Sequence, residues 1–482
     1  MEGSVLHGIW YYVWATILFL FQVGGLFLAA RVVLGSRSTE GTIAWVLSLV
    51  LFPLVSVPIY LIFGRNRLSS YIRARRKVDE EFASSHPLEG RGKQDQTPEE
   101  EALSSQWGIL ENLSKMTLSS ENAVQFYFNG QDTYESMLRG MEEAREYIIF
   151  QVFIFRHDAQ GLRFLDVIRR KAREGVKVYF LVDAIGSNKL RSAFFRKLKK
   201  AGVETGIFLP GRTFRGRLRL NFRNHRKIIV VDGKEAWVGG HNIGIEYVGK
   251  SPRFGPWRDT HVHVSGPVVD AIQLAFLEDW YWVTRSMPPL NWEVAPRNAG
   301  PVRALCLATG PTDPDDTCTL AFVHMINHAR KRLWIHSPYF VPAEEVLVAL
   351  QLATLRGVDV RVLMPAKMDH RLVWLGSFYY SSIPQLDKVR FFRYQPGFLH
   401  SKMMLVDDDL LAVGTVNFDN RSFRINFEIT LILEDPEVIE TCHQQMVQDF
   451  ASAREDPPDP LAERNIFFRL AARAVRLLGP LL

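Results

Sequence analysis

The stretch HRKIIVVD occupies residues 225–232, and HSKMMLVD occupies residues 400–407. Each begins with a histidine, continues with a lysine two positions later and ends in an aspartate after four apolar residues. A glycine and an asparagine then follow at the same offsets in both copies: Gly239 and Asn242, Gly414 and Asn417. Two matches with identical offsets indicate an internal duplication on the scale of a domain.

Apolar strand patterns precede both motifs in the same order. REYIIFQVFIF (145–155) and EGVKVYFLVD (174–183) flank a helical stretch before the first motif. KRLWIHSPYFV (331–341) and RGVDVRVLMP (356–365) do so before the second. Strands that alternate with helices predict an α/β fold in which these strands pair largely in parallel.

The residue types of each motif suit phosphoryl chemistry. On a strand, alternation sends His225 and Lys227 to one face while the apolar run enters the core. An imidazole serves as a nucleophile or a proton carrier near neutral pH. A lysine ammonium supplies a compact positive charge for a phosphate oxygen. The second copy repeats the set with His400 and Lys402.

Two such sets supply what a two-step transfer needs. One imidazole attacks phosphorus to form a phosphohistidine, and the other protonates the leaving alcohol and then deprotonates the incoming one. The lysines stabilise the charged transition state, and Asn242 and Asn417 add neutral donors. We therefore expect His225 and His400 to converge on one phosphate-sized pocket. The sequence has no acidic or histidine cluster with metal-ligand spacing, and we expect neither a metal nor a cofactor.

Two uncharged apolar runs mark the N-terminus as a membrane anchor. Residues 8–30 and 41–64 are each long enough to cross a hydrocarbon core of about 30 Å. We expect residues 1–64 to form a hairpin of two hydrophobic helices. Pro53 and Pro58 lie in the second run, so a shallow re-entrant hairpin remains an alternative to two full crossings.

Basic residues set the expected orientation of this anchor. Six follow the second run: Arg65, Arg67, Arg73, Arg75, Arg76 and Lys77. By the positive-inside rule this flank is cytoplasmic, and two crossings then place the N-terminus there too. The net charge of +6 and the pI of about 9.1 favour an anionic partner, either nucleic acid or anionic lipid.

The paired motifs resemble the HKD motifs of the phospholipase D superfamily, over nearly all of the chain beyond the linker. Further stretches resemble bacterial cardiolipin synthases: LFPLVSVPIYLIFGRNRL (51–68), PWRDTHVHVSGP (256–267), SPYFVPAEEVLVALQLATLRGVDVRVLMP (337–365) and GFLHSKMMLVDDDLLAVGTVNFDNRSFRINFE (397–428). Thr415 stands where that family commonly has a serine, which keeps the hydroxyl.

This resemblance implies a fold and a domain order. It implies an α/β protein with two pseudo-symmetric phospholipase D-like α/β/α domains, over residues 111–295 and 296–455. The hydrophobic hairpin (1–64) and a basic flank with a polar linker (65–110) precede them. Residues 456–482 form an amphipathic tail.

The resemblance also implies roles for single residues. It makes His225 the phospho-linked nucleophile and His400 the general acid and base. The implied phosphate ligands are Lys227, Lys402, Asn242 and Asn417. Glu428 and Asp259 match carboxylates that orient the catalytic histidines. Asp232 and Asp407 complete the catalytic motifs, and we favour a structural role for both.

The leading functional hypothesis is a phosphatidyltransferase that condenses two phosphatidylglycerol molecules into cardiolipin plus glycerol. We expect a multi-pass protein of the bacterial cytoplasmic (inner) membrane, with the catalytic domains on the cytoplasmic side. Its partners are then anionic phospholipids and the bilayer, not nucleic acid. A phospholipase D-type hydrolase and a synthase with phosphatidylethanolamine as phosphatidyl donor remain alternatives, and the oligomeric state stays open. The apolar runs count against nucleic-acid processing, and two complete motif sets count against a non-catalytic scaffold.

Three further features admit two interpretations each. Residues 212–227 hold seven basic residues and form either a solvated loop or a basic lip for anionic head groups. The tail from residue 463 onward is either an interfacial helix on anionic lipid or a helix packed on the protein. His241 and His336 lie near the motifs, where packing or hydrogen bonding explains them more simply than catalysis. We expect Cys306, Cys318 and Cys442 to be packing residues in a reducing compartment.

Overall fold

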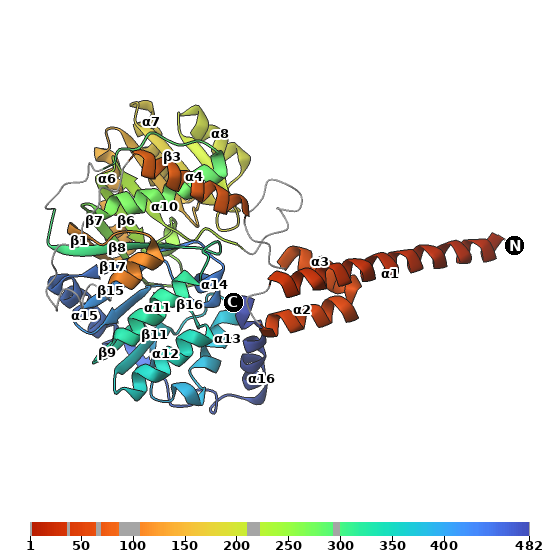
Figure 1. Cartoon of the computed structure of the whole chain (residues 1–482). Coiled ribbons are helices and arrows are strands. Elements are labelled where there is room, and N and C mark those ends of the chain that lie inside the picture. The colour runs from red at the N-terminus through yellow and green to blue at the C-terminus, as the bar shows by residue number, and fades with distance from the viewer. Residues whose placement is uncertain are drawn as a thin grey trace. The chain divides into compact units, whose positions relative to one another are not determined.

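The computed structural model describes residues 2–35, 39–63, 69–85, 107–209, 222–292 and 299–481 (Figure 1). Contacts divide it into two compact units. The N-terminal unit comprises Met1–Leu68 with Leu209–Phe222, and the body comprises Ser69–Phe208 with Arg223–Leu482. Both motif copies lie in the body, so one compact unit carries all of the predicted site residues.

Three helices form the N-terminal unit: α1 (Glu2–Gly35), α2 (Thr39–Leu51) and α3 (Pro53–Phe63). Within the described ranges, one helical segment is long and apolar enough to cross a membrane: Ile9–Gly35, with 27 residues and a mean hydropathy of 2.2. The second apolar run is divided after Leu51, because Pro53 lacks an N–H and starts a new helix. With 13 and 11 residues, α2 and α3 are each about 20 Å long or less.

The body begins with α4 (Ser69–Ser85), which lies inside the range predicted as basic flank and linker. Its apolar residues Tyr71, Ala74 and Val78 are buried at helical spacing. Val78 packs with Leu274 and Leu277 of α10. Many basic residues surround this apolar stripe, so the sequence predicts a basic flank and linker here and not a packed helix. Residues 86–106 of the predicted linker lie outside the described ranges.

The first half of the body contains the following elements: β1 (Ser119–Asn129), α6 (Gly130–Glu143), β2 (Tyr147–Val152), α7 (Ala159–Arg173), β3 (Lys177–Asp183), α8 (Ser192–Lys200), β4 (Glu204–Phe208), β5 (Ile228–Val231), β6 (Glu235–Gly239), η1 (Ile245–Val248), β7 (Trp257–Ser265) and α10 (Val268–Thr284). The predicted strands over 145–155 and 174–183 are present as β2 and β3, and they pair in parallel as expected.

The second half contains β8 (Val302–Thr309), α11 (Thr317–His328), β9 (Arg332–His336), β10 (Phe340–Val341), α12 (Glu344–Leu355), β11 (Asp359–Pro365), α13 (Arg371–Tyr380), η2 (Pro384–Leu386), β12 (Arg390–Tyr394), β13 (Phe398–Leu399), β14 (Met403–Val406), β15 (Leu410–Gly414), β16 (Phe418–Asp419), α14 (Asn420–Arg424), β17 (Glu428–Glu434), α15 (Pro436–Ala451), β18 (Ala453–Glu455), α16 (Ile466–Val475) and η3 (Arg476–Leu481). Here too the predicted strands are confirmed, because β9 and β11 pair in parallel.

One 16-stranded sheet runs through both halves. Fifteen strands follow the order β18-β12-β11-β9-β14-β15-β17-β8-β1-β7-β6-β5-β2-β3-β4, and β13 lies off this path, paired with β7. Apart from β18, this order is the same when followed outward from the centre in either direction. β1 and β8 pair antiparallel at that centre, with Asn122 opposite Val302. The duplication in the sequence is therefore a pseudo-twofold repeat in space, and β5 corresponds to β14. The fold is the expected α/β arrangement with two pseudo-symmetric halves.

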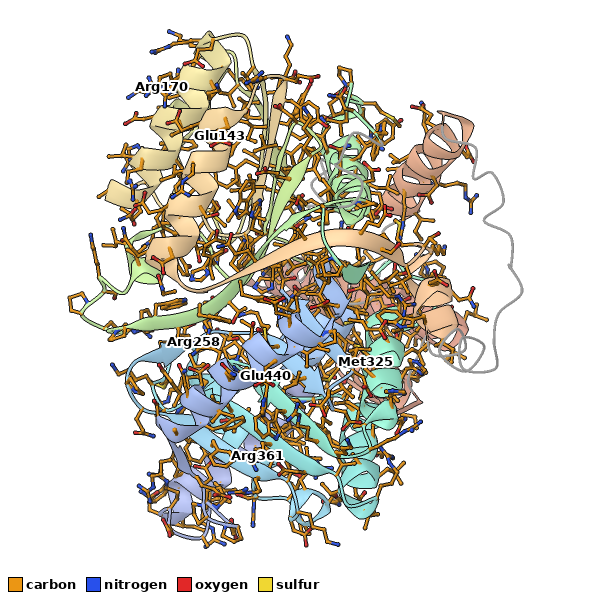
Figure 2. All side chains as sticks on the ribbon, turned by 90° about the vertical axis from the view of Figure 1, so that its left-hand side faces the viewer. Glu143, Arg170, Arg258, Met325, Arg361 and Glu440 are labelled. Carbon is orange, nitrogen blue, oxygen red and sulfur yellow. The ribbon has the colours of Figure 1, made fainter. Side chains whose placement is uncertain are left out.

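Helices cover both faces of each half. On β2, Ile148, Phe150 and Val152 join the core formed with α6 and α7. On the opposite face of the same strand, Tyr147 bonds Gln273 of α10 at 2.7 Å. Figure 2 shows the two halves with Arg258 between them: Glu143 and Arg170 mark helices of the first half, and Met325 and Glu440 mark helices of the second. The alternation of strand side chains thus produces α/β/α layers.

Candidate active site

Each motif histidine lies in a segment that pairs with the other half of the body. The backbone N–H of His225 donates to the Phe427 carbonyl at 2.9 Å, and the Phe427 N–H donates to the Arg223 carbonyl at 2.8 Å. In the mirrored arrangement, β13 pairs in parallel with the start of β7, and the His400 N–H donates to the Arg258 carbonyl at 2.7 Å. Backbone pairing across the halves therefore fixes both histidines.

The carboxylates that orient the two histidines are exchanged between the halves. His225 Nδ1 lies 2.9 Å from Glu428 Oε2, across 203 positions of sequence. His400 Nδ1 lies 2.6 Å from Asp259 Oδ2, across 141 positions. Both acids are fully buried. The resemblance implied an orienting acid for each histidine, and the structure adds that each acid comes from the opposite repeat.

These contacts assign the protons on the two rings. A carboxylate accepts hydrogen bonds only, so the Nδ1 atom beside it carries the proton in each histidine. Lys402 Nζ also approaches His400 Nδ1, at 2.9 Å, but the contact of this nitrogen with Asp259 is shorter, at 2.6 Å. The Nε2 atom of each neutral ring is then unprotonated and available for attack or for proton uptake. This is the arrangement that a carboxylate–imidazole pair provides in a catalytic triad.

Burial and the neighbouring charges keep both imidazoles neutral. Burial lowers the pKa of His225, against the raising effect of Glu428 and with a further lowering by Lys227. Burial, reinforced by Lys402 and opposed by Asp259, lowers the pKa of His400 to about 4. Burial alone would raise the pKa of Asp259, but its interactions with His400 and Lys402 outweigh burial and lower that pKa.

The two lysines lie beside their own histidines. Lys227 Nζ donates to the His225 carbonyl at 2.6 Å, and Lys402 Nζ donates to the His400 carbonyl. Burial, opposed by Glu428, lowers the pKa of Lys227 to about 7, and burial, opposed by Asp259, lowers that of Lys402 to about 8. An anionic phosphate bound between them would raise both pKa values, because an opposite charge favours the charged form.

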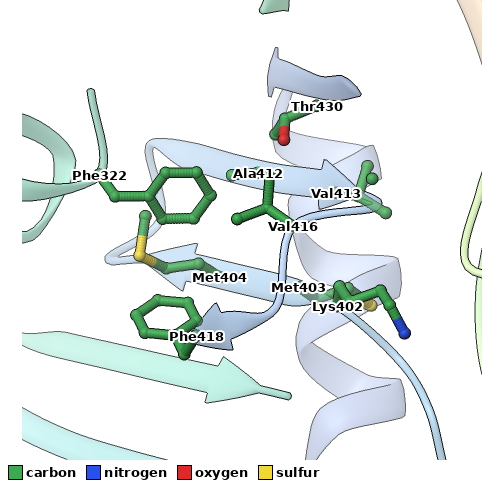
Figure 3. Close-up of a pocket in the computed structure, with 10 residues that line it drawn as sticks. Phe322, Lys402, Met403, Met404, Ala412, Val413, Val416, Phe418 and Thr430 are labelled. Atoms are coloured by element: carbon green, nitrogen blue, oxygen red, sulfur yellow. The ribbon is translucent and has the colours of Figure 1, made fainter. Parts of the chain in front are cut away.

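The packing beneath Lys402 fixes the direction of its side chain. Figure 3 shows the small apolar cavity lined by Phe322, Met404, Val416 and Phe418, from which the Lys402 amine points away. The stem of the lysine borders this cavity. The Lys402 amine is buried and points away from the apolar cavity, so it is directed at the site and not at solvent.

The two asparagines differ in their surroundings. Asn242 Oδ1 accepts from the backbone N–H of Ile154 at 3.0 Å, which leaves the Asn242 amide N–H groups to donate. Asn417 Oδ1 is buried and has no hydrogen-bond partner among the described residues. Both side chains follow the strand that pairs with their motif strand, β6 in the first half and β15 in the second.

The motif aspartates lie at the far ends of the motif strands. The Asp232 carboxylate accepts three backbone N–H groups, from Arg145, Glu146 and Tyr147, each at 2.8 Å. The Asp407 carboxylate accepts the equivalent three backbone N–H groups, from Arg330, Lys331 and Arg332, also at 2.8 Å. Both aspartates have positive φ, 52° and 50°, which aspartate tolerates better than most residues. These contacts favour the structural role.

A glycine and a threonine occupy equivalent positions behind the orienting acids. A Cβ on Gly240 would lie 1.9 Å from Asp259 Oδ1, so only glycine at this position leaves room for the carboxylate. Thr415 is the counterpart of Gly240, and its hydroxyl accepts from the Ile429 N–H at 2.9 Å, next to Glu428. The hydroxyl that the sequence retains at residue 415 thus fixes the start of β17.

Two buried ion pairs near the site were not predicted. Arg226 Nη1 lies 3.0 Å from Asp279 Oδ2, and Arg226 Nε donates to the Glu428 carbonyl at 3.1 Å. Arg258 Nη2 lies 2.6 Å from Asp449 Oδ2. Each aspartate sits on the long helix after β7 or β17. No motif spacing links these residues, although Arg226 and Arg258 each stand beside a predicted site residue.

Other sequence expectations have mixed outcomes. Residues 212–221 of the expected basic lip lie outside the described ranges, and Arg226 is internal to the body rather than part of a lip. His241 and His336 are fully buried, and no ring nitrogen of either has a hydrogen-bond partner in the described part of the chain. Packing therefore accounts for them. The three cysteines are free and buried. Across the described ranges, no group of three or more His, Cys, Asp or Glu is arranged to hold a metal ion.

Comparison with known proteins identifies the family. The family described as "Cardiolipin synthase, PLD-like domain" matches residues 137–251 and 322–450, which contain both motif copies. Cardiolipin synthase A of Pseudomonas putida (strain W619) is 41% identical over 474 residues, which cover 98% of this chain and 99% of the relative. The chain belongs to the cardiolipin synthase family. As a member, it is a phosphatidyltransferase of the phospholipase D superfamily.

Further comparisons agree with membership of the cardiolipin synthase family. Cardiolipin synthase A of Pseudomonas aeruginosa (strain LESB58) is 42% identical, with 96% of this chain and 94% of the relative covered. A family described as "Phospholipase D-nuclease N-terminal" matches residues 26–65. Among solved structures, the phosphatidylserine synthase of Haemophilus influenzae Rd KW20 aligns with a TM-score of 0.61 at 13% identity, covering 78% of this chain and all of that one. That similarity concerns the fold.

Proposed function

We propose that the chain condenses two phosphatidylglycerol molecules into cardiolipin and glycerol through a phosphohistidine intermediate. The observation that carries this proposal is the exchange of orienting acids, His225 with Glu428 and His400 with Asp259. An imidazole oriented by the other repeat has a defined tautomer only when both repeats are assembled. The two half-sites therefore act as one site with two imidazoles.

In the first step, His225 Nε2 attacks the phosphorus of one phosphatidylglycerol. The bond from phosphorus to the glycerol oxygen breaks, and His400 donates the proton that the leaving glycerol takes up. Lys227 and Lys402 stabilise the charge that develops on the phosphoryl oxygens. The anionic substrate raises the pKa of His400, so this imidazole takes up a proton on Nε2 in the complex and can donate it to the leaving glycerol.

In the second step, a hydroxyl of the second phosphatidylglycerol loses its proton to His400 and attacks phosphorus. The bond between phosphorus and His225 breaks, and cardiolipin leaves. The proton lost by His400 in the first step is regained in the second, so neither water nor a cofactor is consumed. Asn242 and Asn417 donate to the phosphate, and Asp232 and Asp407 hold the motif strands.

The test is a product assay with labelled phosphatidylglycerol in liposomes. We expect cardiolipin and free glycerol in equal amounts. Phosphatidic acid as the main product would assign the site to a hydrolase that uses water as the acceptor. Cardiolipin that forms only when phosphatidylethanolamine is added, with release of ethanolamine, would assign that lipid as the phosphatidyl donor.

We also propose that the body lies on the cytoplasmic side of the bacterial inner membrane. The basic residues after the second apolar run support this side. Arg75 contributes less than the others, because it is ion-paired inside the body with Glu278 and Asp313. Digestion of the body by protease added outside sealed right-side-out vesicles would contradict this orientation.

For the anchor itself, we propose a single crossing by α1 and a re-entrant hairpin formed by α2 and α3. The division of the second run at Pro53 and the short lengths of α2 and α3 support this arrangement over two full crossings. It places the N-terminus on the non-cytoplasmic side of that membrane. Labelling of a cysteine at Ser4 by a membrane-impermeant maleimide in intact cells supports it, and protection of that cysteine would instead favour two crossings.

A further inference from the structure

The C-terminal helix α16 (Ile466–Val475) has one face packed on the body. Phe468 contacts the rings of Trp374 and Phe378 on α13, at centroid distances of 5.8 and 5.4 Å. Ala472 is fully buried in the same cluster, and Val475 is 5% exposed. This part of the tail is thus a packed helix, as one of the two interpretations of the sequence expected.

The opposite face of α16 carries large apolar side chains that nothing covers within the described chain. Phe467 is 80% exposed, and Ile466 and Leu470 are each more than half exposed. The apolar surface continues into η3, where Leu477 is 82% exposed. Single exposed apolar residues are common, but a contiguous set on one helix face indicates a binding surface.

The charge around this face identifies its occupant. From Arg464 to Leu482 the sequence has four arginines and no acidic residue. Arg473 is exposed and lies one helical turn beyond Leu470, on the uncovered side. A helix with an apolar face bordered by arginines suits the interface of an anionic bilayer, where apolar groups enter the acyl boundary and arginines meet the head groups.

The tail also connects this face to the active site. The Gly479 carbonyl in η3 accepts from Asn420 Nδ2 at 3.0 Å. Asn420 begins α14, three residues after the predicted phosphate ligand Asn417. A Cβ on Gly376 of α13 would lie 3.5 Å from Val475. The uncovered surface is therefore held by direct contacts against α13 and the start of α14, which follows the segment of Asn417.

We propose that the exposed face of α16 and η3, formed by Ile466, Phe467, Leu470, Leu477 and Leu478, docks on the surface of an anionic bilayer. Docking there keeps the loop of Asn417 next to the membrane that supplies the lipid. The proposal goes beyond the catalytic role and depends on the proposed function only in taking lipid as the substrate.

The test measures the depth of single labels on the full-length protein in vesicles. Cysteines replace Phe467 and Leu477, and Val447→Cys is the control. Val447 is 45% exposed on α15, and Figure 1 places α15 and α16 on opposite sides of the second half. The native cysteines are at most 2% exposed, so a fluorescent maleimide reacts with the introduced ones. Vesicles contain spin-labelled lipid, with or without phosphatidylglycerol.

We expect the labels at 467 and 477 to be quenched by the spin-labelled lipid, more strongly with phosphatidylglycerol present, and the label at 447 to be unquenched. Equal quenching at all three positions, no quenching at 467 and 477, or quenching that ignores phosphatidylglycerol would overturn the proposal. A disulfide between two chains through the cysteine at 467 would also overturn it, because a second copy would then cover the face. None of these readouts needs turnover, so they remain informative if the proposed reaction is wrong.

A functional arm uses Leu470→Glu, with Val447→Glu as its control. We expect Leu470→Glu to lower product formation in vesicles by about tenfold, the effect of losing one buried leucine side chain from the interface. In mixed detergent micelles, where no bilayer surface has to be bound, its rate should equal that of the wild type. Equal rates of the two variants in vesicles would contradict docking through α16.

Discussion

Glu428, in the second half of the body, lies 2.9 Å from the imidazole of His225 in the first half. Its counterpart Asp259, in the first half, lies 2.6 Å from His400 in the second. The exchange follows from the antiparallel pairing of β1 with β8, which brings the two repeats together about a pseudo-twofold axis. Neither repeat alone holds a histidine together with its acid, so the site exists only in the assembled pair.

Glu428→Gln and Asp259→Asn should each lower the turnover number on the order of 10²–10⁴-fold, because an amide does not hold the imidazole in the required tautomer or stabilise its charge. Because the two acids contact different histidines, the two variants should differ in the formation of the covalent intermediate. Glu428→Gln should impair the formation of covalent label on His225. Asp259→Asn should still permit some label, as we also expect of His400→Ala. Glu434→Gln, at the other end of β17, is the control and should turn over normally. Label lost in Asp259→Asn but retained in Glu428→Gln would reverse the pairing of roles.

Gly240→Ala should inactivate the enzyme without unfolding it. The new Cβ would lie 1.9 Å from Asp259 Oδ1 and would push this carboxylate away from His400. A displacement of about 1 Å at a catalytic group costs on the order of 10²-fold in rate. The rate and the thermal midpoint should be measured together. Gly108→Ala is the control, since a Cβ there meets nothing within 4 Å. Wild-type rates for Gly240→Ala would show that Asp259 does not need its present position.

Asp279→Ala should destabilise the body strongly. It removes the partner of the buried Arg226 guanidinium and also an acceptor for Tyr71, at 2.7 Å. Loss of one partner of a buried ion pair costs about 3–5 kcal/mol, because the remaining charge stays buried without compensation. Asp408→Ala, which breaks an exposed pair with Arg332, should cost less than about 1 kcal/mol. Thermal unfolding in detergent compares the two variants. Similar midpoints would contradict a stabilising role of Asp279.

Part of this site could be predicted from the sequence alone. The histidines, lysines and asparagines recur at fixed offsets. The strand alternation expected for His225 and Lys227 does not apply, because both residues precede β5 (Ile228–Val231). The exchange of acids could not be predicted, because 203 and 141 positions separate the partners and only the pairing of the two halves brings them together. No sequence pattern indicates the buried ion pair of Arg226, because its partner Asp279 lies on a helix with no repeated motif. The division of the second apolar run was suggested by Pro53, but its consequence for the anchor depends on helix lengths that the sequence does not set.

The pH dependence of kcat/KM should have an unusually early alkaline limb. Burial lowers the pKa of Lys227 to about 7 and that of Lys402 to about 8, and both must be charged to stabilise the transferred phosphoryl group. Activity per free enzyme should therefore fall as the pH rises through about 7 to 8. Bound substrate raises both pKa values, so the limb in kcat should lie at higher pH than the limb in kcat/KM.

Lys227→Arg provides the matched variant for this profile. Arginine stays charged at all accessible pH values, so the first part of the alkaline limb should move upward even where the rate is reduced. A wild-type profile that stays flat to about pH 10, where an ordinary lysine titrates, would contradict the lowered pKa values.

The central claim is that one histidine of the pair carries the phosphatidyl group, and that this histidine is His225. Rapid quenching of the reaction with labelled phosphatidylglycerol, followed by detection of acid-labile and base-stable label on the protein, tests it directly. We predict label on the wild type and some label on His400→Ala, where loss of the acid slows departure of the leaving group by about 10²–10⁴-fold. His225→Ala should carry none, because no covalent intermediate can form. Label on His225→Ala together with its absence from His400→Ala would contradict this assignment.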